Sequence, residues 1–106
     1  KNVFPEELED RLNLIPSVKE SVVLSRDNSE GEAEIVAVIV PDYEVVGEGT
    51  SDAAISFILK EAIAQINKTL PVYKHIDRFE IRHSDFEKTL TKKIKRFLVD
   101  CKVWYR

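Results

Sequence analysis

The run Glu34–Val40 restricts the possible folds more than any other feature of the sequence. Its last six residues are all apolar and mostly β-branched, which favours a strand with both faces covered. The shorter strand-like run Glu20–Ser25 precedes it, and the turn-forming residues 26–31 between them are too few for a crossover connection. The two runs therefore predict an antiparallel hairpin within one domain, since 106 residues suffice for a single core.

Helical patterns lie on both sides of this hairpin. The segment Pro5–Leu14 begins with a proline, which suits the first helical position, and Pro16 ends it. Residues 43–50 contain two glycines and predict a surface loop. Beyond this loop, apolar residues recur at steps of three and four as far as Leu70, so we expect a long amphipathic helix capped within residues 50–52.

The last third of the chain adds one strand and one helix. Arg78–Arg82 alternates polar and apolar residues, as a half-buried strand does. A polar loop follows, and Thr91–Val99 predicts a short helix with Ile94, Phe97 and Leu98 facing inward, whereas residues 100–106 show no clear period. The order helix, strand, strand, helix, strand, helix predicts an α+β fold, a small sheet of about three strands with helices packed on it, over residues 1–106.

Composition excludes several classes of protein. The only cysteine is Cys101, so an internal disulfide is impossible and a reducing, cytoplasmic location is expected. With two histidines besides, we expect no zinc cluster or other metal site. No apolar run approaches the roughly 20 residues that span a bilayer. The sequence contains no methionine, which predicts that it is a piece of a longer protein.

Positive charge is concentrated late in the chain. Residues 1–53 carry a net charge of −9 and residues 54–106 carry +6. The segment Lys88–Arg96 has five cations and no acid, which indicates either an anionic partner or a solvated helix face. Nucleic acid is the less favoured partner, because no aromatic residue lies among these cations. His75, His83 and Cys101 are better explained as surface, hydrogen-bonded or inert groups than as catalysts.

Four stretches in register resemble the C-terminal domain of the adenylate-forming acyl-CoA synthetases, closest to the long-chain fatty acid–CoA ligase branch. Lys1–Glu9 is similar to the family's G-x-N-I-x-P-x-E-I-E, and Val36–Pro41 to its central strand. Leu70–Lys74 is similar to L-P-x-Y-K, and Phe86–Arg96 to L-P-K-T-x-x-G-K-I-x-R.

The resemblance implies a lid domain that works with a large N-terminal domain of the same polypeptide. That enzyme would join a fatty acid to ATP, with Mg²⁺, and then transfer the acyl group from the adenylate to coenzyme A. The lid rotates between the two half-reactions, and the family's motif lysine, here Lys93, enters the active site for adenylation. Lys1 and Asn2 would lie near the coenzyme A entrance. Lys95 and Arg96 would either help to hold phosphates or lie in solvent.

The sequence departs from the family motif at two positions. Lys92 stands where the family has glycine, and Glu87 where it has proline. A lysine at position 92 predicts a less sharply turned backbone than a glycine would allow. A shift of one residue would make Lys92 the catalytic group, but the spacing of Lys93, Ile94 and Arg96 matches K-I-x-R and favours Lys93.

Two other functions are compatible with these residues. One is that of an enzyme that loads a carrier protein instead of coenzyme A, and the other is that of a free-standing module that binds an anion such as nucleic acid through residues 88–96; both rank below the ligase. For the ligase, we expect the acyl and nucleotide pockets to lie in the N-terminal domain, so that this chain alone is inactive. Long-chain substrates are compatible with peripheral membrane contact of the whole enzyme.

Overall fold

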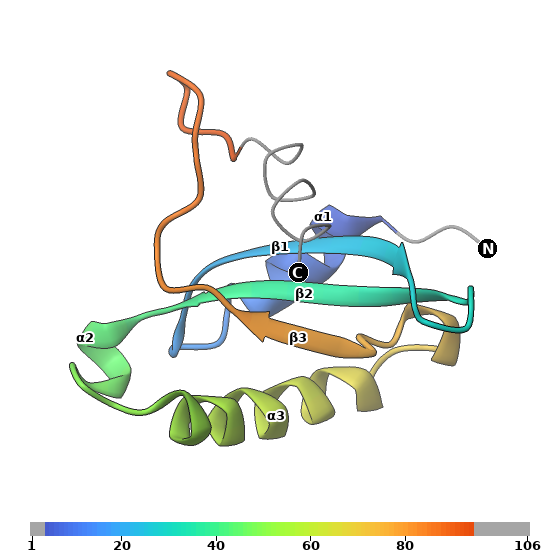
Figure 1. The fold of residues 1–106 in the computed structure, drawn as a ribbon, viewed down its shortest axis with the longest axis horizontal. Coiled ribbons are helices and arrows are strands. Elements are labelled where there is room, and N and C mark those ends of the chain that lie inside the picture. Colours follow the sequence, from blue (N-terminus) through green and yellow to red (C-terminus); the bar gives the residue numbers. More distant parts are fainter. Residues whose placement is uncertain (1–3, 95–106) are drawn as a thin grey trace.

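A three-stranded sheet with the strand order β1-β2-β3 organises the computed structural model, which describes residues 4–94 (Figure 1). Strands β1 and β2 form an antiparallel hairpin, and β3 lies parallel to β2. The fold is α+β, as the sequence predicts. The elements are, in order, α1 (Pro5–Leu12), β1 (Val18–Asp27), β2 (Ala33–Pro41), α2 (Tyr43–Val46), α3 (Asp52–Lys68), the 3-10 helix η1 (Val72–Lys74) and β3 (Arg78–Ile81).

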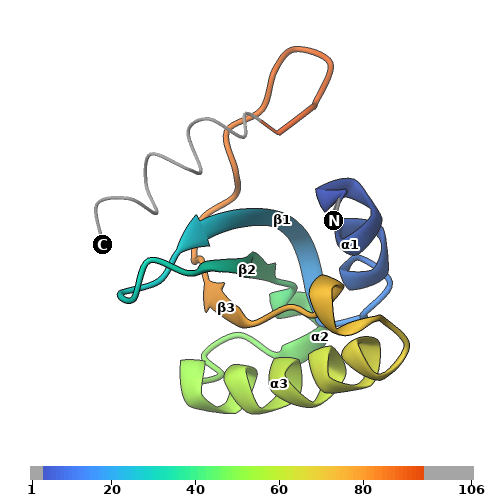
Figure 2. The ribbon, with the colours of Figure 1, turned by 90° about the vertical axis from the view of Figure 1, so that its right-hand side faces the viewer.

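Both faces of β2 are covered, which confirms the expectation from its continuous apolar run. On one face α1 and α3 pack against alternate residues of the hairpin (Figure 2). The main core residues on this helix-covered face are Leu8, Leu12, Val23, Ile35, Ala37, Ile39, Ile55, Leu59 and Ile63. The opposite face is covered by residues that follow β3. Its core residues are Val22, Leu24, Val38, Val40 and Phe86, with Ile94 packed against them.

Local chemistry explains the ends and the docking of the two longer helices. The Ser51 hydroxyl accepts a hydrogen bond from the Ala54 backbone N–H at 3.2 Å, which caps α3 within the predicted range. In α1, the buried carboxylate of Glu9 accepts a hydrogen bond from the Val23 backbone N–H at 2.7 Å. Because β1 is an edge strand, this bond ties the helix to the sheet through an otherwise unpaired donor.

The structure differs from the sequence-based expectation in two places. Residues 43–46 form the short helix α2 instead of a loop, because the Asp42 carboxylate accepts a hydrogen bond from the Glu44 N–H at 3.0 Å and caps it. The helix predicted from Thr91 is wrong over residues 91–94, where the chain turns back and Ile94 pairs with Lys88 in an antiparallel bridge. Residues 95–99 of that prediction and the tail 100–106 lie outside the described residues.

Candidate functional site

The segment that follows β3, residues 82–94, projects from the sheet as an arm (Figure 1). The base of the arm is anchored by Phe86, which is only 3% exposed. Its ring packs into the core on the sheet face opposite the helices, which we call the second core. The guanidinium of Arg82 lies 5.1 Å from the centre of the Phe86 ring, a cation–π contact that holds the ring from outside. The Arg82 backbone N–H also donates to the carbonyl of Ile39 at 2.8 Å, so the arm leaves the sheet in a fixed direction.

Two ion pairs with β1 fasten the lower part of the arm. Lys19 contacts Asp85 at 3.0 Å, and Lys88 contacts Glu20 at 2.6 Å. The hydrogen bond to Asp85, followed by the Coulomb attraction of the same carboxylate, raises the pKa of Lys19. Lys88 belongs to the basic segment Lys88–Arg96 noted in the sequence, but its ammonium group is already paired with a carboxylate of its own domain.

The outer end of the arm is a tight loop, residues 89–93, which we call the tip. The Lys92 N–H donates to the Thr89 carbonyl at 2.9 Å, and the Thr89 N–H donates to the Lys93 carbonyl at 2.8 Å. The Thr89 hydroxyl also accepts from the Lys93 N–H at 3.2 Å. This bonding pattern is that of a three-residue hairpin loop whose last residue adopts a left-handed conformation.

Lys92 has a φ of 67°, and among residues 4–94 it is the only non-glycine residue with a positive φ. The milder backbone expected from a lysine at this position is therefore wrong. Closing the loop requires the conformation that glycine adopts readily, and the two backbone hydrogen bonds impose it on a lysine. The left-handed region costs a non-glycine residue about 1–2 kcal/mol.

The tip presents unpaired cations to solvent. Lys92 and Lys93 are both exposed, and among the described residues no carboxylate lies within ion-pair distance of either. The hydroxyls of Thr89 and Thr91 in the same loop lie 3.0 Å apart. The tip thus carries two lysines and two threonines, residue types whose side chains donate to phosphate or carboxylate oxygens. Four predicted ligand contacts, Lys1, Asn2, Lys95 and Arg96, lie outside the described residues.

The histidines have structural partners. His75 Nε2 lies 2.9 Å from the Leu70 carbonyl oxygen. His83, at the start of the arm, has its Nδ1 3.2 Å from the Tyr43 hydroxyl and its Nε2 3.0 Å from Asp52 Oδ2. Sequence reasoning missed this cluster, because its members come from three separate elements and carry no common spacing.

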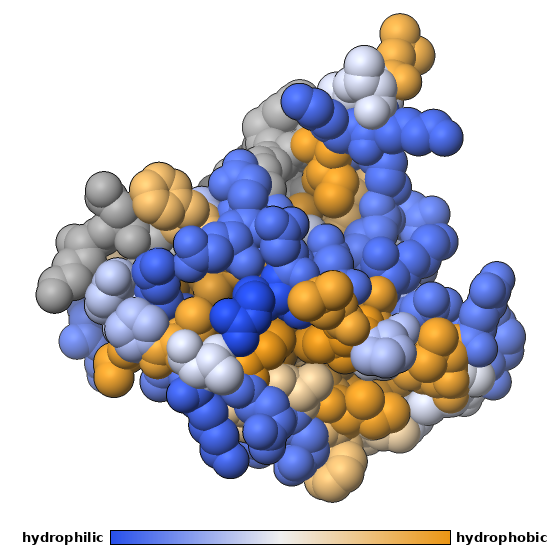
Figure 3. Space-filling model, turned by 180° about the vertical axis from the view of Figure 1, so that it is seen from behind, coloured by the Kyte–Doolittle hydropathy of each residue, from blue (hydrophilic) through white to orange (hydrophobic). Residues whose placement is uncertain are grey.

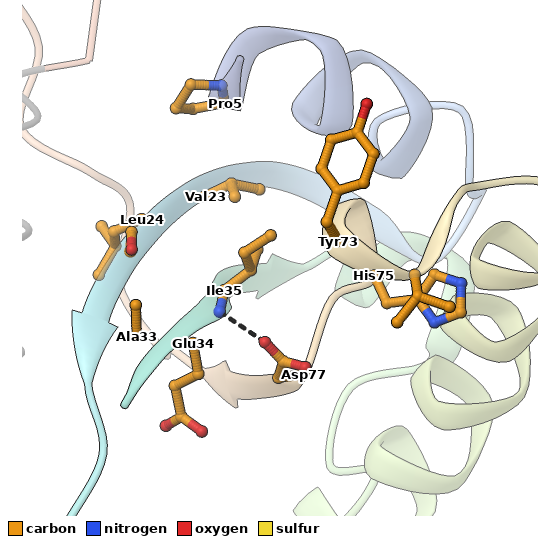
Figure 4. A pocket seen from close by; sticks show the side chains of 11 residues that line it. Pro5, Val23, Leu24, Ala33, Glu34, Ile35, Tyr73, His75 and Asp77 are labelled. Carbon is orange, nitrogen blue, oxygen red and sulfur yellow. Dashed lines mark hydrogen bonds between the residues drawn. The ribbon is translucent and has the colours of Figure 1, made fainter. Parts of the chain in front are cut away.

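A groove of about 550 Å³ lies between the hairpin, the start of α1 and η1 (Figure 4). Its acidic residue Asp77 is already used, since the carboxylate accepts a hydrogen bond from the Ile35 N–H at 2.8 Å. No residue of the arm lines this groove. The groove and the tip are therefore separate features of the molecule.

Two further findings limit the kinds of site within the described part of the chain. Residues 4–94 contain no helix with the length and apolar character needed to cross a membrane. In the same range, no three His, Cys, Asp or Glu side chains converge in an arrangement that could hold a metal ion.

Comparison with known proteins identifies the fold. No family model and no curated protein matches the chain, whereas solved structures do. An acyl-CoA synthetase from Brucella canis has 19% sequence identity and a TM-score of 0.74, covering 99% of this chain and 18% of its own. A benzoate CoA ligase from Burkholderia xenovorans LB400 has 26% identity and a TM-score of 0.71, covering 93% and 18%. A Mycobacterium tuberculosis fatty acyl CoA synthetase has 20% identity and a TM-score of 0.71, covering 96% and 18%.

By their names, these neighbours are acyl- and aryl-CoA ligases. The chain spans less than a fifth of the length of each neighbour. Its fold is therefore that of a small region within such a ligase.

Proposed function

We propose that this chain is the small mobile domain of an AMP-forming CoA ligase and that Lys93 is its catalytic residue for adenylation. The observation that carries the proposal is that Lys93, at the tip of the arm, is exposed and forms no ion pair with any of residues 4–94. A lysine in that position can enter the active site of a companion domain without breaking an ion pair within the described residues. The order of the motifs and the fold of the neighbours agree with this assignment.

In the first half-reaction, a carboxylate oxygen of the acid attacks the α-phosphorus of ATP. The bond from that phosphorus to the bridging oxygen breaks, and pyrophosphate leaves with the electron pair. Two anions must approach one another, and the ammonium of Lys93 would lie between them and stabilise the charge that develops in the transition state. Since the described residues contain no fitting metal site, we assign no step on this chain to Mg²⁺.

In the second half-reaction, the thiol of coenzyme A attacks the carbonyl carbon of the acyl-adenylate. The thiol proton passes to solvent or to a base of the companion domain, the C–S bond forms, and the bond from the carbonyl carbon to the phosphate oxygen breaks so that AMP leaves with the electron pair. This step brings no second anion against the phosphate before bond formation, so it does not need the ammonium of Lys93. We infer that the arm rotates away at this stage.

The test uses the polypeptide that contains this chain together with its companion domain. We expect Lys93→Ala to slow acid-dependent pyrophosphate exchange by about 10²–10³-fold or more, and to slow thioester formation from supplied acyl-adenylate much less. Lys92→Ala is the comparison variant, which removes the neighbouring ammonium group, and it should slow pyrophosphate exchange much less than Lys93→Ala does. Equal losses in both half-reactions would contradict the proposal, and a larger loss in Lys92→Ala would move the catalytic role by one residue.

We further propose a long-chain fatty acid as the substrate and coenzyme A as the acceptor. The motif resemblance supports both assignments. Pyrophosphate exchange with a short aliphatic, an aromatic and a long-chain acid tests the first assignment. The second is tested by supplying coenzyme A or a phosphopantetheinylated carrier protein to the acyl-adenylate; faster transfer to the carrier would favour the alternative acceptor.

A further inference from the structure

We propose that Leu90 is an apolar anchor that docks into the companion domain when the arm closes for adenylation. This inference rests on the proposed function and extends it from the reacting atoms to the surface that must receive the tip. Leu90 would add binding energy in one arrangement of the two domains and none in the other. It would thus favour the arrangement in which Lys93 reaches the substrates.

Leu90 is the most exposed large hydrophobic residue of the described chain, at 104%. Figure 3 shows that the projecting arm ends in a hydrophobic side chain, and Leu90 is the hydrophobic residue of the tip. Single exposed hydrophobic side chains are common on protein surfaces. The position of Leu90 is informative because the arm holds it away from any core of its own domain.

The loop geometry couples Leu90 to Lys93. Both belong to the hairpin loop that is closed by the hydrogen bonds from Thr89 to Lys93 and from Lys92 to Thr89. The tip therefore moves as one unit. If Lys93 reaches the carboxylate and the α-phosphate, Leu90 must enter the same surface of the companion domain, where it loses its contact with water.

The companion domain is a better occupant than a membrane or a second copy of this chain. The tip offers one apolar side chain among lysines and threonines. A stable dimer requires about 1,200–2,000 Å² of buried surface, and even a single myristoyl chain binds a bilayer only marginally. A companion domain that already encloses Lys93 would supply the rest of the contact area. In the solved neighbours, more than four-fifths of the chain lies outside the matched region, so a large companion domain is expected.

Replacing Leu90 by serine in the two-domain polypeptide tests the proposal. We expect kcat/KM for pyrophosphate exchange to fall about 10- to 100-fold, which is the range expected when a leucine is no longer buried. Thioester formation from supplied acyl-adenylate should stay unchanged, because the tip has left the companion domain by then. Leu90→Met should keep the exchange rate within about twofold of the wild-type rate, since methionine is an apolar side chain of similar volume.

Val72→Ser is the matched control, because Val72 is 82% exposed on η1 and far along the chain from the arm. It should leave both half-reactions unchanged. Equal thermal unfolding midpoints in all variants are expected, as neither side chain belongs to a core. A lower midpoint in Leu90→Ser alone would mean that Leu90 packs within its own domain and would overturn the proposal.

Three other outcomes would also overturn it. Equal losses in both half-reactions would indicate a general defect instead of docking in one arrangement. Unchanged exchange in Leu90→Ser, combined with lost binding to phosphatidylserine vesicles or lost dimerisation in sedimentation, would assign Leu90 to a membrane or to a second copy. Lys93→Ala separates the two hypotheses: if it abolishes exchange while Leu90→Ser does not, only the docking role fails, and if neither affects exchange, the proposed function fails.

Discussion

The two faces of the sheet are covered in different ways. Among the described residues 4–94, the helix-covered face has a core of twelve buried residues drawn from both helices, β1, β2 and the segment before β3. Within the same residues, the opposite face has a core of five, and Phe86 of the arm is the member that comes from outside the hairpin. A face covered by two helices cannot be opened without unfolding the domain. The arm, which covers the opposite face within residues 4–94, can open while the hairpin beneath it stays intact.

The same contrast recurs within the arm. Its base has a buried aromatic ring and ion pairs to Lys19 and Glu20, whereas its tip has none of these. The tip is therefore held in shape by its own backbone hydrogen bonds and held in place by the base. The exposed side chains of the tip therefore contribute little to the stability of the domain.

Alanine substitutions in the two cores would test this difference most strongly. Leu59 of α3 is fully buried on the helix-covered face, and Leu59→Ala should lower the free energy of unfolding by about 2–5 kcal/mol. Phe86→Ala should cost less, about 1.5–3 kcal/mol, because the arm can undock and leave no cavity. Urea denaturation followed by circular dichroism measures both values.

Hydrogen exchange then shows whether the two faces open separately. In Phe86→Ala the amides of Thr89 and Lys92 should exchange faster while that of Val23, bonded to Glu9, stays protected. In Leu59→Ala all three should lose protection together. Equal destabilisation by both substitutions, with simultaneous exchange everywhere, would show that the two faces form one cooperative unit.

Local sequence patterns predicted the helix-covered half well. The covered apolar run of β2, the antiparallel hairpin and a cap for α3 within residues 50–52 are each determined by neighbours in the chain, and all three are confirmed. The pairing of His83 with Tyr43 and Asp52 depends on contacts between residues more than 30 positions apart. Such contacts leave no periodic signal, so the sequence alone could not reveal them.

The arm shows more directly that helix propensity alone does not decide the local structure. Residues 91–94 have a helical pattern, yet the bridge from Lys88 to Ile94 places them in a hairpin. The prediction failed because loop closure, with the burial of Ile94 against the second core, outweighs a weak helical preference. The role of Lys93 came from motif resemblance alone and stays a prediction, while the full exposure of Leu90 became visible only with the loop geometry.

A smaller effect is expected at the tip, where strain can be removed without touching the base. Lys92→Gly should raise the free energy of unfolding by about 1 kcal/mol, because glycine adopts the positive φ of this position without the steric cost that a lysine has. Thermal and urea denaturation of the chain would measure the gain. The gain in stability should be largest for partial unfolding in which the arm itself unfolds.

Lys92→Ala is the control for charge. It removes the same ammonium but keeps a Cβ atom in the left-handed conformation, so it should show no comparable gain. If Lys92→Gly and Lys92→Ala had equal stability, the conformational account would be wrong, and any gain would come from reduced repulsion with Lys93.

The smallest expected effect concerns the ion pairs at high pH. The carboxylate of Asp85 raises the pKa of Lys19, and that of Glu7 raises the pKa of Lys74, each chiefly through a hydrogen bond and each from a reference of 10.5. A raised pKa in the folded state means that the stabilisation is complete below the unfolded value and is lost as the pH rises through the folded one.

The stability difference between the wild type and Lys19→Met should therefore shrink as the pH rises from about 9 to about 12, and the difference for Lys74→Met should shrink likewise. Both effects should be slight, since the pairs are exposed to solvent. Only Lys19→Met should speed amide exchange at the tip, because Lys74 joins η1 to α1 and Lys19 holds the arm. Faster tip exchange in both variants would mean that the arm does not open independently of the helix-covered body.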